Sequence, residues 1–247
     1  MPRFFLQRAN INDGIVTITG DDAWHIERSL RMRPGEHVTV CDMQKRVYDC
    51  VLTEFTPDKV FARVVSEHDS DTEPPVFIRL YQALPKSDKL DTIIQKAVES
   101  GASEIVPFES ERCVVRVEPS KEARKLERRA RISLEAAKQC GRGVIPTVRE
   151  PLTFDKALED ASDCGLILFF YEGDGTKPLR EVLEAIPDME APEKIAVFIG
   201  SEGGFSLSEV ERAKNAGAVV CGLGKRILRC ETAPGFALAC LSYRFEL

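Results

Sequence analysis

The stretch from Ile195 to Thr232 constrains the fold of this chain more than any other. It opens with an apolar run, residues 195–199, whose β-branched and aromatic side chains are typical of a strand buried on both faces. The run stops at Gly200, and Gly203 and Gly204 follow. Because glycine reaches positive φ values and lets the backbone approach a ligand closely, we predict a tight loop at the end of this strand.

A helix is predicted directly after this loop. Ser206 stands three residues before Glu209, which is the spacing of a capping box at a helix N-terminus. An apolar helical face then continues to Gly217, a residue type that commonly ends helices. The loop therefore leads into a helix N-terminus.

A second strand, residues 219–223, ends in another glycine turn. The chain after it brings Arg226, Arg229 and Glu231 to the same end of the sheet. Two loops that leave the carboxyl ends of two strands form a crevice, which is the usual ligand position in open α/β sheets. We therefore predict a binding crevice here, although glycine-rich turns also occur for packing reasons alone.

The glycine spacing does not by itself identify the ligand. Gly200-x-x-Gly203-Gly204 fits neither the dinucleotide fingerprint nor the P-loop pattern. A nicotinamide dehydrogenase fits poorly, because residues 221–224 occupy the place where an acidic residue would hold the ribose. The serine-hydrolase motif GxSxG is absent, and with three histidines and no HExxH motif we expect no metal site.

The charge distribution bears on a nucleic-acid partner. The net charge of −6 argues against one, because phosphate binding is driven by Lys and Arg. Residues 112–149, however, carry eleven Lys and Arg against four Glu. This run fits either an RNA-binding surface or an ordinary solvated helix face.

The chain up to about Glu67 is expected to form a small β-rich, barrel-like domain with one helix at residues 21–32. Phe4, Phe5 and Trp24 are expected in its core. The polar segment 67–75 is the predicted linker, and it divides the chain into domains 1–72 and 73–247. The expected strands are residues 4–6, 15–18, 38–41, 47–55 and 60–65.

Strands and helices alternate after this linker, which implies a mostly parallel sheet covered on both faces. In the long helix 120–140 we expect an apolar stripe of Ala123, Leu126, Ala130, Leu134 and Ala137, with the arginines off it. The other expected strands are 76–84, 104–108 and 165–171, and the other helices are 89–100, 154–159 and 179–186.

Cysteine usage and apolar runs indicate a cytoplasmic protein. The eight cysteines include no CxxC pair and several lie in apolar runs, which is typical of reduced, buried thiols. The N-terminus lacks a long apolar segment, and runs such as residues 166–171 are too short to cross a bilayer.

Two segments in the last fifty residues resemble the carboxyl-terminal signatures of a known family. They are IGSEGGFS (residues 199–206) and LGKRILRCETA (residues 223–233), and the family is RsmE, SPOUT-class methyltransferases of small-subunit ribosomal RNA. Ser201 departs from the proline usual in the first signature. The resemblance extends to PRFF (2–5), HIERSLRMRPGE (25–36), residues 85–113 and EAAKQCGR (135–142), where Lys138 is a further departure.

The resemblance implies an α/β, SPOUT-type trefoil-knotted parallel-sheet domain preceded by a small PUA-like β-barrel. Connectivity rules alone would predict an unknotted doubly wound sheet. The resemblance also implies bound S-adenosylmethionine, a homodimer, and methylation of uridine N3 in the 16S ribosomal RNA of the 30S subunit. Because N3 lies on the pairing edge, the uridine must be unpaired or flipped out.

The candidate site residues follow from this implied activity. Main-chain groups and apolar walls would bind the methyl donor, from Leu168, Ile199, Gly200, Gly203, Gly204, Gly222, Leu223, Gly224, Ile227, Leu228, Thr232 and Ala233. Arg142 and Arg229 are candidates for holding phosphate or the uracil oxygens, and Glu202 or Glu231 for the general base. Candidate RNA contacts are Arg3, Arg31, Arg33, Lys121, Arg124 and Arg128.

Two alternatives stay open at this point. One is a methyltransferase of the same class that acts on transfer RNA, and the other is a non-catalytic RNA-binding assembly factor. Binding of S-adenosylmethionine separates both enzymes from the assembly factor, and the RNA that accepts the methyl group separates the two enzymes.

Overall fold

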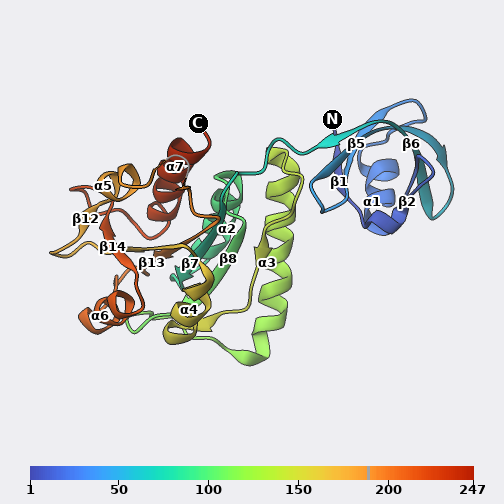
Figure 1. The fold of residues 1–247 in the computed structure, drawn as a ribbon. Coiled ribbons are helices and arrows are strands. Elements are labelled where there is room, and N and C mark those ends of the chain that lie inside the picture. The colour runs from blue at the N-terminus through green and yellow to red at the C-terminus, as the bar shows by residue number, and fades with distance from the viewer. Residues whose placement is uncertain (188–189) are drawn as a thin grey trace. The chain divides into compact units, whose positions relative to one another are not determined.

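The computed structural model describes residues 1–187 and 190–247 of the chain (Figure 1). These residues form two compact units. The first comprises Met1–Glu73 together with Ala137–Ile145, and the second comprises Pro74–Ala136 together with Pro146–Leu247. Each unit has its own sheet.

The first unit is built on a sheet with the strand order β1-β4-β5-β6-β3-β2. Apart from the parallel pair β1 and β4, neighbouring strands run antiparallel, as expected for short strands joined by turns. Alternate apolar side chains of these strands form the core, for example Val16 and Ile18, which are fully buried. The strands are β1 (Arg3–Phe5), β2 (Ile11–Asn12), β3 (Ile15–Thr19), β4 (His37–Cys41), β5 (Arg46–Phe55) and β6 (Lys59–Asp69).

The helix expected at residues 21–32 is shorter and less regular than its sequence suggested. The structure has α1 (Gly20–Trp24) followed by a single π-type turn, His25–Ser29. Arg31 then takes a left-handed conformation with φ of 54°, and Pro34 disfavours helical geometry in the residue before it. Trp24, expected in the core, is 62% exposed, whereas Phe4 is buried.

The expected linker at residues 67–75 was also placed too early. Strand β6 continues to Asp69, which pairs with Arg46 of β5. The polar residues of this segment have partners across the strand pair, because Arg46 forms ion pairs with Glu67 and with Asp69. Cross-strand charge pairs of this kind support an exposed strand end that looks like a linker in the sequence.

The segment Ala137–Ile145 joins the first unit through a buried ion pair. Arg142 Nη2 donates to Glu73 Oε2 at 2.6 Å, and the same carboxylate accepts the backbone N–H groups of Gly143 and Val144. Arg3 donates to the carbonyl oxygen of Arg142 at 3.1 Å. Lys138, the family departure, pairs with Asp22 at 3.2 Å.

The second unit is an α/β unit whose central sheet has the order β10-β8-β7-β13-β11-β14-β12, with β9 beside β8. Every one of these pairs is parallel, which confirms the expected mostly parallel sheet. The strands are β7 (Phe77–Ala83), β8 (Glu104–Glu109), β9 (Thr147–Val148), β10 (Leu152–Thr153), β11 (Leu166–Phe170), β12 (Lys177–Pro178), β13 (Lys194–Ile199) and β14 (Val219–Gly222).

Helices follow most of these strands and pack on the sheet (Figure 1). Helix α7 packs against both β13 and helix α2. The helices are α2 (Lys89–Glu99), α3 (Pro119–Cys140), α4 (Phe154–Asp160), α5 (Leu179–Glu184), α6 (Leu207–Asn215) and α7 (Ala233–Phe245).

Strand β13 occupies the middle of the sheet although it comes late in the chain. It lies between β7 and β11, and its residues Ile195–Ile199 are almost completely buried. The ring of Phe198 stacks on Tyr81 with centroids 4.3 Å apart, and Phe169 and Phe205 pack nearby. The all-apolar run in the sequence therefore corresponds to the core strand that it predicted.

The apolar stripe predicted for α3 is only partly correct. Ala137 is buried, and Leu126 and Leu134 are half-buried. Ala123 and Ala130, however, are exposed, and the buried face carries Glu122, Arg129 and Ser133 as well. Arg129 Nη1 lies 2.5 Å from Glu122 Oε1, so the two buried charges neutralise each other. The apolar spacing predicted the buried face of α3 incorrectly at Ala123 and Ala130, because a buried ion pair does not appear in the periodicity of apolar residues.

The cysteines and the helices add two observations. All eight cysteines lie within the described residues and are free thiols, five of them buried. Within residues 1–187 and 190–247, none of the helices combines the length and the apolar composition needed to cross a membrane.

Candidate functional site

The candidate site lies where three neighbouring strands of the second unit end. Strands β13, β11 and β14 are adjacent and parallel, so their carboxyl ends lie at one edge of the sheet. Phe170, Ile199 and Gly222 are the last residues of these strands, and all three line a cavity of about 450 Å³. Ligand pockets in proteins typically measure roughly 300–1,000 Å³. The predicted crevice is therefore present at the predicted strand ends.

Glycines leave the main chain open on one wall of this pocket. A Cβ atom on Gly200 would lie 3.2 Å from the Cα of Gly204, and one on Gly222 would lie 3.2 Å from Thr176 Oγ1. Gly204 has φ of +61°, and its N–H donates to the carbonyl oxygen of Ser201 at 2.9 Å to close a turn. These positions need glycine for space or conformation, and they present backbone groups to the pocket.

The helix after the glycine loop begins with the predicted capping box. Glu209 N–H donates to Ser206 Oγ at 3.2 Å, and Ser206 N–H donates to Glu209 Oε2 at 2.9 Å. The other carboxylate oxygen of Glu209 accepts the N–H of Glu111 at 2.8 Å. This buried carboxylate fixes the point at which the loop turns into α6.

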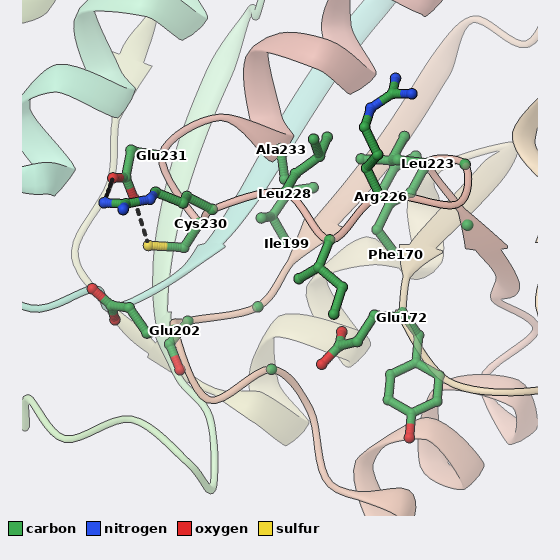
Figure 2. Close-up of a pocket in the computed structure, with 18 of the residues that line it drawn as sticks. Phe170, Glu172, Ile199, Glu202, Leu223, Arg226, Leu228, Cys230, Glu231 and Ala233 are labelled. Carbon is green, nitrogen blue, oxygen red and sulfur yellow. Dashed lines mark hydrogen bonds and ion pairs between the residues drawn. The ribbon is translucent and has the colours of Figure 1, made fainter.

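One end of the pocket holds a cluster of charged side chains around Lys89. Its Nζ lies 3.0 Å from Glu202 Oε1 and 3.1 Å from Glu231 Oε2, and the thiol of Cys230 donates to Glu231 Oε2 at 3.3 Å. Hydrogen bonds to Glu202 and Glu231 raise the pKa of Lys89. Figure 2 shows Glu202, Cys230 and Glu231 gathered at this end, away from Glu172.

Both carboxylates of this cluster are held in the ionised form. Burial by itself raises the pKa of Glu202, but hydrogen bonds from Lys89 and from backbone N–H groups outweigh it and leave the pKa lowered. The pKa of Glu231 is lowered by its own backbone N–H, by Cys230 and by Lys89. Burial raises the pKa of Cys230 to about 12, so this side chain stays a neutral thiol.

Most of the residues expected to bind a ligand do line the pocket, and three do not. Leu168 lies inside β11 and is fully buried, Gly203 faces Arg112, and Thr232 lies just before α7. Those that line it are Ile199, Gly200, Gly204, Gly222, Leu223, Gly224, Ile227, Leu228 and Ala233.

The four candidate catalytic residues separate into two groups. Glu202, Glu231 and Arg229 line the pocket, and the Arg229 side chain is 82% exposed, 4.0 Å from Glu231. Arg142 does not line the pocket and is only 4% exposed in its pair with Glu73. That pairing favours a structural role for Arg142.

The candidate RNA contacts belong to both units. Arg31 and Arg33 are exposed, whereas Arg3 is half-buried and donates to Cys41 and to the Arg142 carbonyl. On α3, the side chains of Lys121 and Arg128 are 64% and 63% exposed, and Arg124 is exposed as well.

Sequence reasoning missed several residues of the pocket. Tyr171 is the last residue of a predicted strand and Glu172 directly follows it, so the rule that ligands bind at strand ends would have found them. Lys89 begins α2, far away in the sequence, and no local pattern points to it. The other lining residues outside the expected set are Phe170, Thr176, Ser201, Lys225 and Cys230. Arg226, which the sequence placed at this end of the sheet, lines the pocket as well.

Comparisons with known proteins agree with this arrangement. Residues 72–242 match the family model of an RNA methyltransferase domain, and residues 18–65 match that of an RNA methyltransferase PUA domain. Ribosomal RNA small subunit methyltransferase E of Bacillus subtilis is 34% identical, with 100% of this chain and 98% of that protein covered.

Two solved structures are similar over nearly the whole chain. One is a ribosomal RNA small subunit methyltransferase E from Neisseria gonorrhoeae bound to S-adenosyl methionine, with a TM-score of 0.85, 32% identity and 98% and 97% of the two chains covered. The other is a putative methyltransferase from Legionella pneumophila with the bound cofactor SAM, with a TM-score of 0.85, 29% identity and 98% and 96% covered.

Proposed function

Since the chain belongs to the RNA methyltransferase family, we propose that it transfers a methyl group from S-adenosylmethionine to N3 of a specific uridine in the 16S ribosomal RNA of the small subunit. The observation that carries this proposal is the glycine-lined pocket at the carboxyl ends of β11, β13 and β14. Relatives that match this chain almost end to end are named for methylation of small-subunit ribosomal RNA, and two similar structures hold this donor.

The residues of the pocket fit S-adenosylmethionine. Ile199, Leu223 and Leu228 supply apolar walls for the adenine, and the glycine turns supply backbone N–H and C=O groups at close range. Ser201 Oγ is buried and pairs with no other group among the described residues, so its hydroxyl can hydrogen-bond a polar group of the donor. Ser201 occupies the position at which members of this family usually have proline.

The donor supplies an activated methyl group on a sulfonium, and the chain supplies position and charge. Much of the rate enhancement is expected from holding N3 in line with the methyl group. The exposed Arg229 guanidinium at the pocket is placed to bind the uracil oxygens or a phosphate as negative charge develops. Glu202 and Glu231 are the candidate acceptors of the N3 proton, because both line the pocket as carboxylates.

RNA binding is assigned to the exposed cations of both units. Arg31 and Arg33 in the first unit and Lys121, Arg124 and Arg128 on α3 would bind phosphates, which position the RNA without reading its sequence. The target base must leave its stack to expose N3, so the protein is expected to prefer an unpaired uridine.

The proposal includes a homodimer with a knotted carboxyl-terminal region. An apolar groove beside the glycine turn at Gly222 is lined by Leu179, Leu183, Phe236 and Tyr243, and the last two side chains are 40% and 79% exposed. Exposed apolar surface of this kind fits a second copy of the chain. Sedimentation at several concentrations tests the dimer.

A ribosomal substrate also implies that the protein works in the cytoplasm.

Two measurements test the function against its alternatives. Calorimetric titration with S-adenosylmethionine should give binding at one site per chain, and absence of binding would leave the non-catalytic assembly factor. Incubation with methyl-labelled donor and either small subunits or bulk transfer RNA should label the subunits. Label confined to transfer RNA would favour the alternative substrate.

A further inference from the structure

Lys89 connects three segments that are far apart in the sequence. It is the first residue of α2, and its ammonium contacts Glu202 in the loop after β13 and Glu231 in the loop after β14. These two loops carry the glycines that form the wall of the pocket. A single cation therefore bridges both glycine loops to the start of α2.

Each carboxylate of the cluster also has partners other than Lys89, among them its own backbone N–H. Glu202 additionally accepts the N–H of Lys86 at 3.2 Å and 3.3 Å through its two oxygens, and Glu231 accepts the thiol of Cys230. Arg229 is a second cation near the pair, but its approach to Glu231 at 4.0 Å is long and its side chain is mostly in solvent. The pocket is also lined, outside this cluster, by Glu172, Lys225 and Arg226.

We propose that Lys89 is a positioning residue: it holds Glu202 and Glu231 together so that the two glycine loops form the donor site and present both carboxylates on the pocket wall. The inference deepens the proposed function and rests on it. The donor carries a sulfonium cation, so ionised carboxylates on the lining favour its binding electrostatically. Lys89 acts through these carboxylates rather than by touching the reacting atoms.

Loss of the Lys89 charge should change how donor binding depends on pH, whereas loss of packing alone should not. Two carboxylates that face each other without a cation cannot both stay ionised easily, and one of them takes up a proton at a higher pH than usual. With Lys89 present, the pKa values of both lie below the ordinary value of 4.5, so neither binds a proton near neutral pH. Burial raises the pKa of Cys230 to about 12, so its thiol stays neutral over the same range.

The test is calorimetric titration with S-adenosylmethionine from about pH 5.5 to about pH 8.5, a range in which ordinary carboxylates stay ionised. Lys89→Met should bind the donor about tenfold more weakly at neutral pH, since directly coupled residues interact on this scale. Relative to wild type at the same pH, its affinity should fall further as the pH is lowered, a comparison that cancels the titration of the donor's own α-amino group. Lys89→Arg keeps the charge and should restore most of the affinity at every pH.

Lys96→Met is the matched control. Lys96 lies on the same helix and forms an ion pair with Glu99 at 2.8 Å, but it does not line the pocket. The Lys96→Met variant should bind the donor like wild type at each pH. Thermal unfolding of every variant checks the fold, and if Lys89→Met fails to fold, Lys89→Gln carries the same expectation.

The outcomes distinguish the inference from the function on which it rests. Wild-type binding together with unchanged affinity in Lys89→Met overturns the inference and leaves the proposed function intact. A loss by the same factor at every pH, without rescue by arginine, also overturns it, because that pattern indicates a purely structural side chain. If wild type itself does not bind the donor, the proposed function fails, and the inference fails with it.

Discussion

The guanidinium of Arg142 lies 2.6 Å from a carboxylate oxygen of Glu73, and the two side chains are only 5% and 8% exposed. Arg142 was a candidate for holding phosphate or the uracil oxygens, yet its buried side chain is paired and lies outside the pocket lining. Removing one partner of such a pair leaves an uncompensated buried charge. The pair therefore predicts an effect on stability first.

We expect Arg142→Met to lower the free energy of unfolding by about 3–5 kcal/mol, the usual result of breaking a buried ion pair. Urea denaturation measures this value. The double variant Arg142→Met, Glu73→Gln should recover part of the loss, because it removes the stranded charge. A single variant as stable as wild type, with turnover abolished, would instead return Arg142 to the catalytic residues.

Replacing Gly200 by alanine should weaken donor binding. The added Cβ would meet backbone atoms of Gly204 at 3.2 Å and 3.3 Å, which can move only if the glycine loop changes shape. We expect at least a tenfold rise in the dissociation constant, about 1.4 kcal/mol. Calorimetry with S-adenosylmethionine measures it.

Gly235→Ala serves as the control for that substitution. A Cβ on Gly235 meets nothing within 4 Å, and the residue lies in α7 outside the pocket lining. Alanine in a helix is favoured over glycine by roughly 0.5–1 kcal/mol, so this variant should bind normally and be slightly more stable. Equal binding by both alanine variants would mean that the Gly200 loop does not shape the donor site.

Arg229→Ala should reduce turnover while leaving the fold intact. Its side chain is 82% exposed, so stability should change by less than about 0.5 kcal/mol. If the guanidinium stabilises developing charge, turnover should fall by about 10²-fold. Arg229→Lys keeps the positive charge but lacks the planar guanidinium, so its turnover should lie between those of wild type and Arg229→Ala. Methyl transfer to small subunits at saturating donor measures the turnover of both variants. Unchanged turnover in Arg229→Ala would show that the role assigned to Arg229 is wrong.

Replacing Lys121, Arg124 and Arg128 together by alanine should weaken RNA binding across sequences. Each cation that no longer binds a phosphate should reduce the slope of log affinity against log salt by about 1. Filter binding at several salt concentrations measures this slope. The control replaces Lys96, Lys194 and Lys214, which are surface cations outside α3. Equal slopes for wild type and the α3 variant would make that surface an ordinary solvated helix face.

The sequence predicted the elements whose signals are local. The apolar run at residues 195–199 became the buried strand β13, and the Ser206 and Glu209 spacing became a complete capping box. Both features depend on residues within a few positions of one another. The glycine pattern likewise located the loops that line the pocket.

Features that depend on distant partners were missed or misplaced. The strand β6 was cut short because Arg46, which pairs with its polar end, comes from β5. Lys89 was missed because its partners lie more than a hundred residues later. The buried face of α3 was misassigned for a different reason: Glu122 and Arg129 lie on the same helix, but their ion pair replaces apolar side chains there.

The most direct test of the account is the identity of the methylated nucleoside. Small subunits incubated with the protein and labelled S-adenosylmethionine should yield, after digestion of their RNA and mass spectrometry, label in 3-methyluridine from 16S ribosomal RNA. Label in another nucleoside, label in transfer RNA alone, or no label with active small subunits would contradict the account.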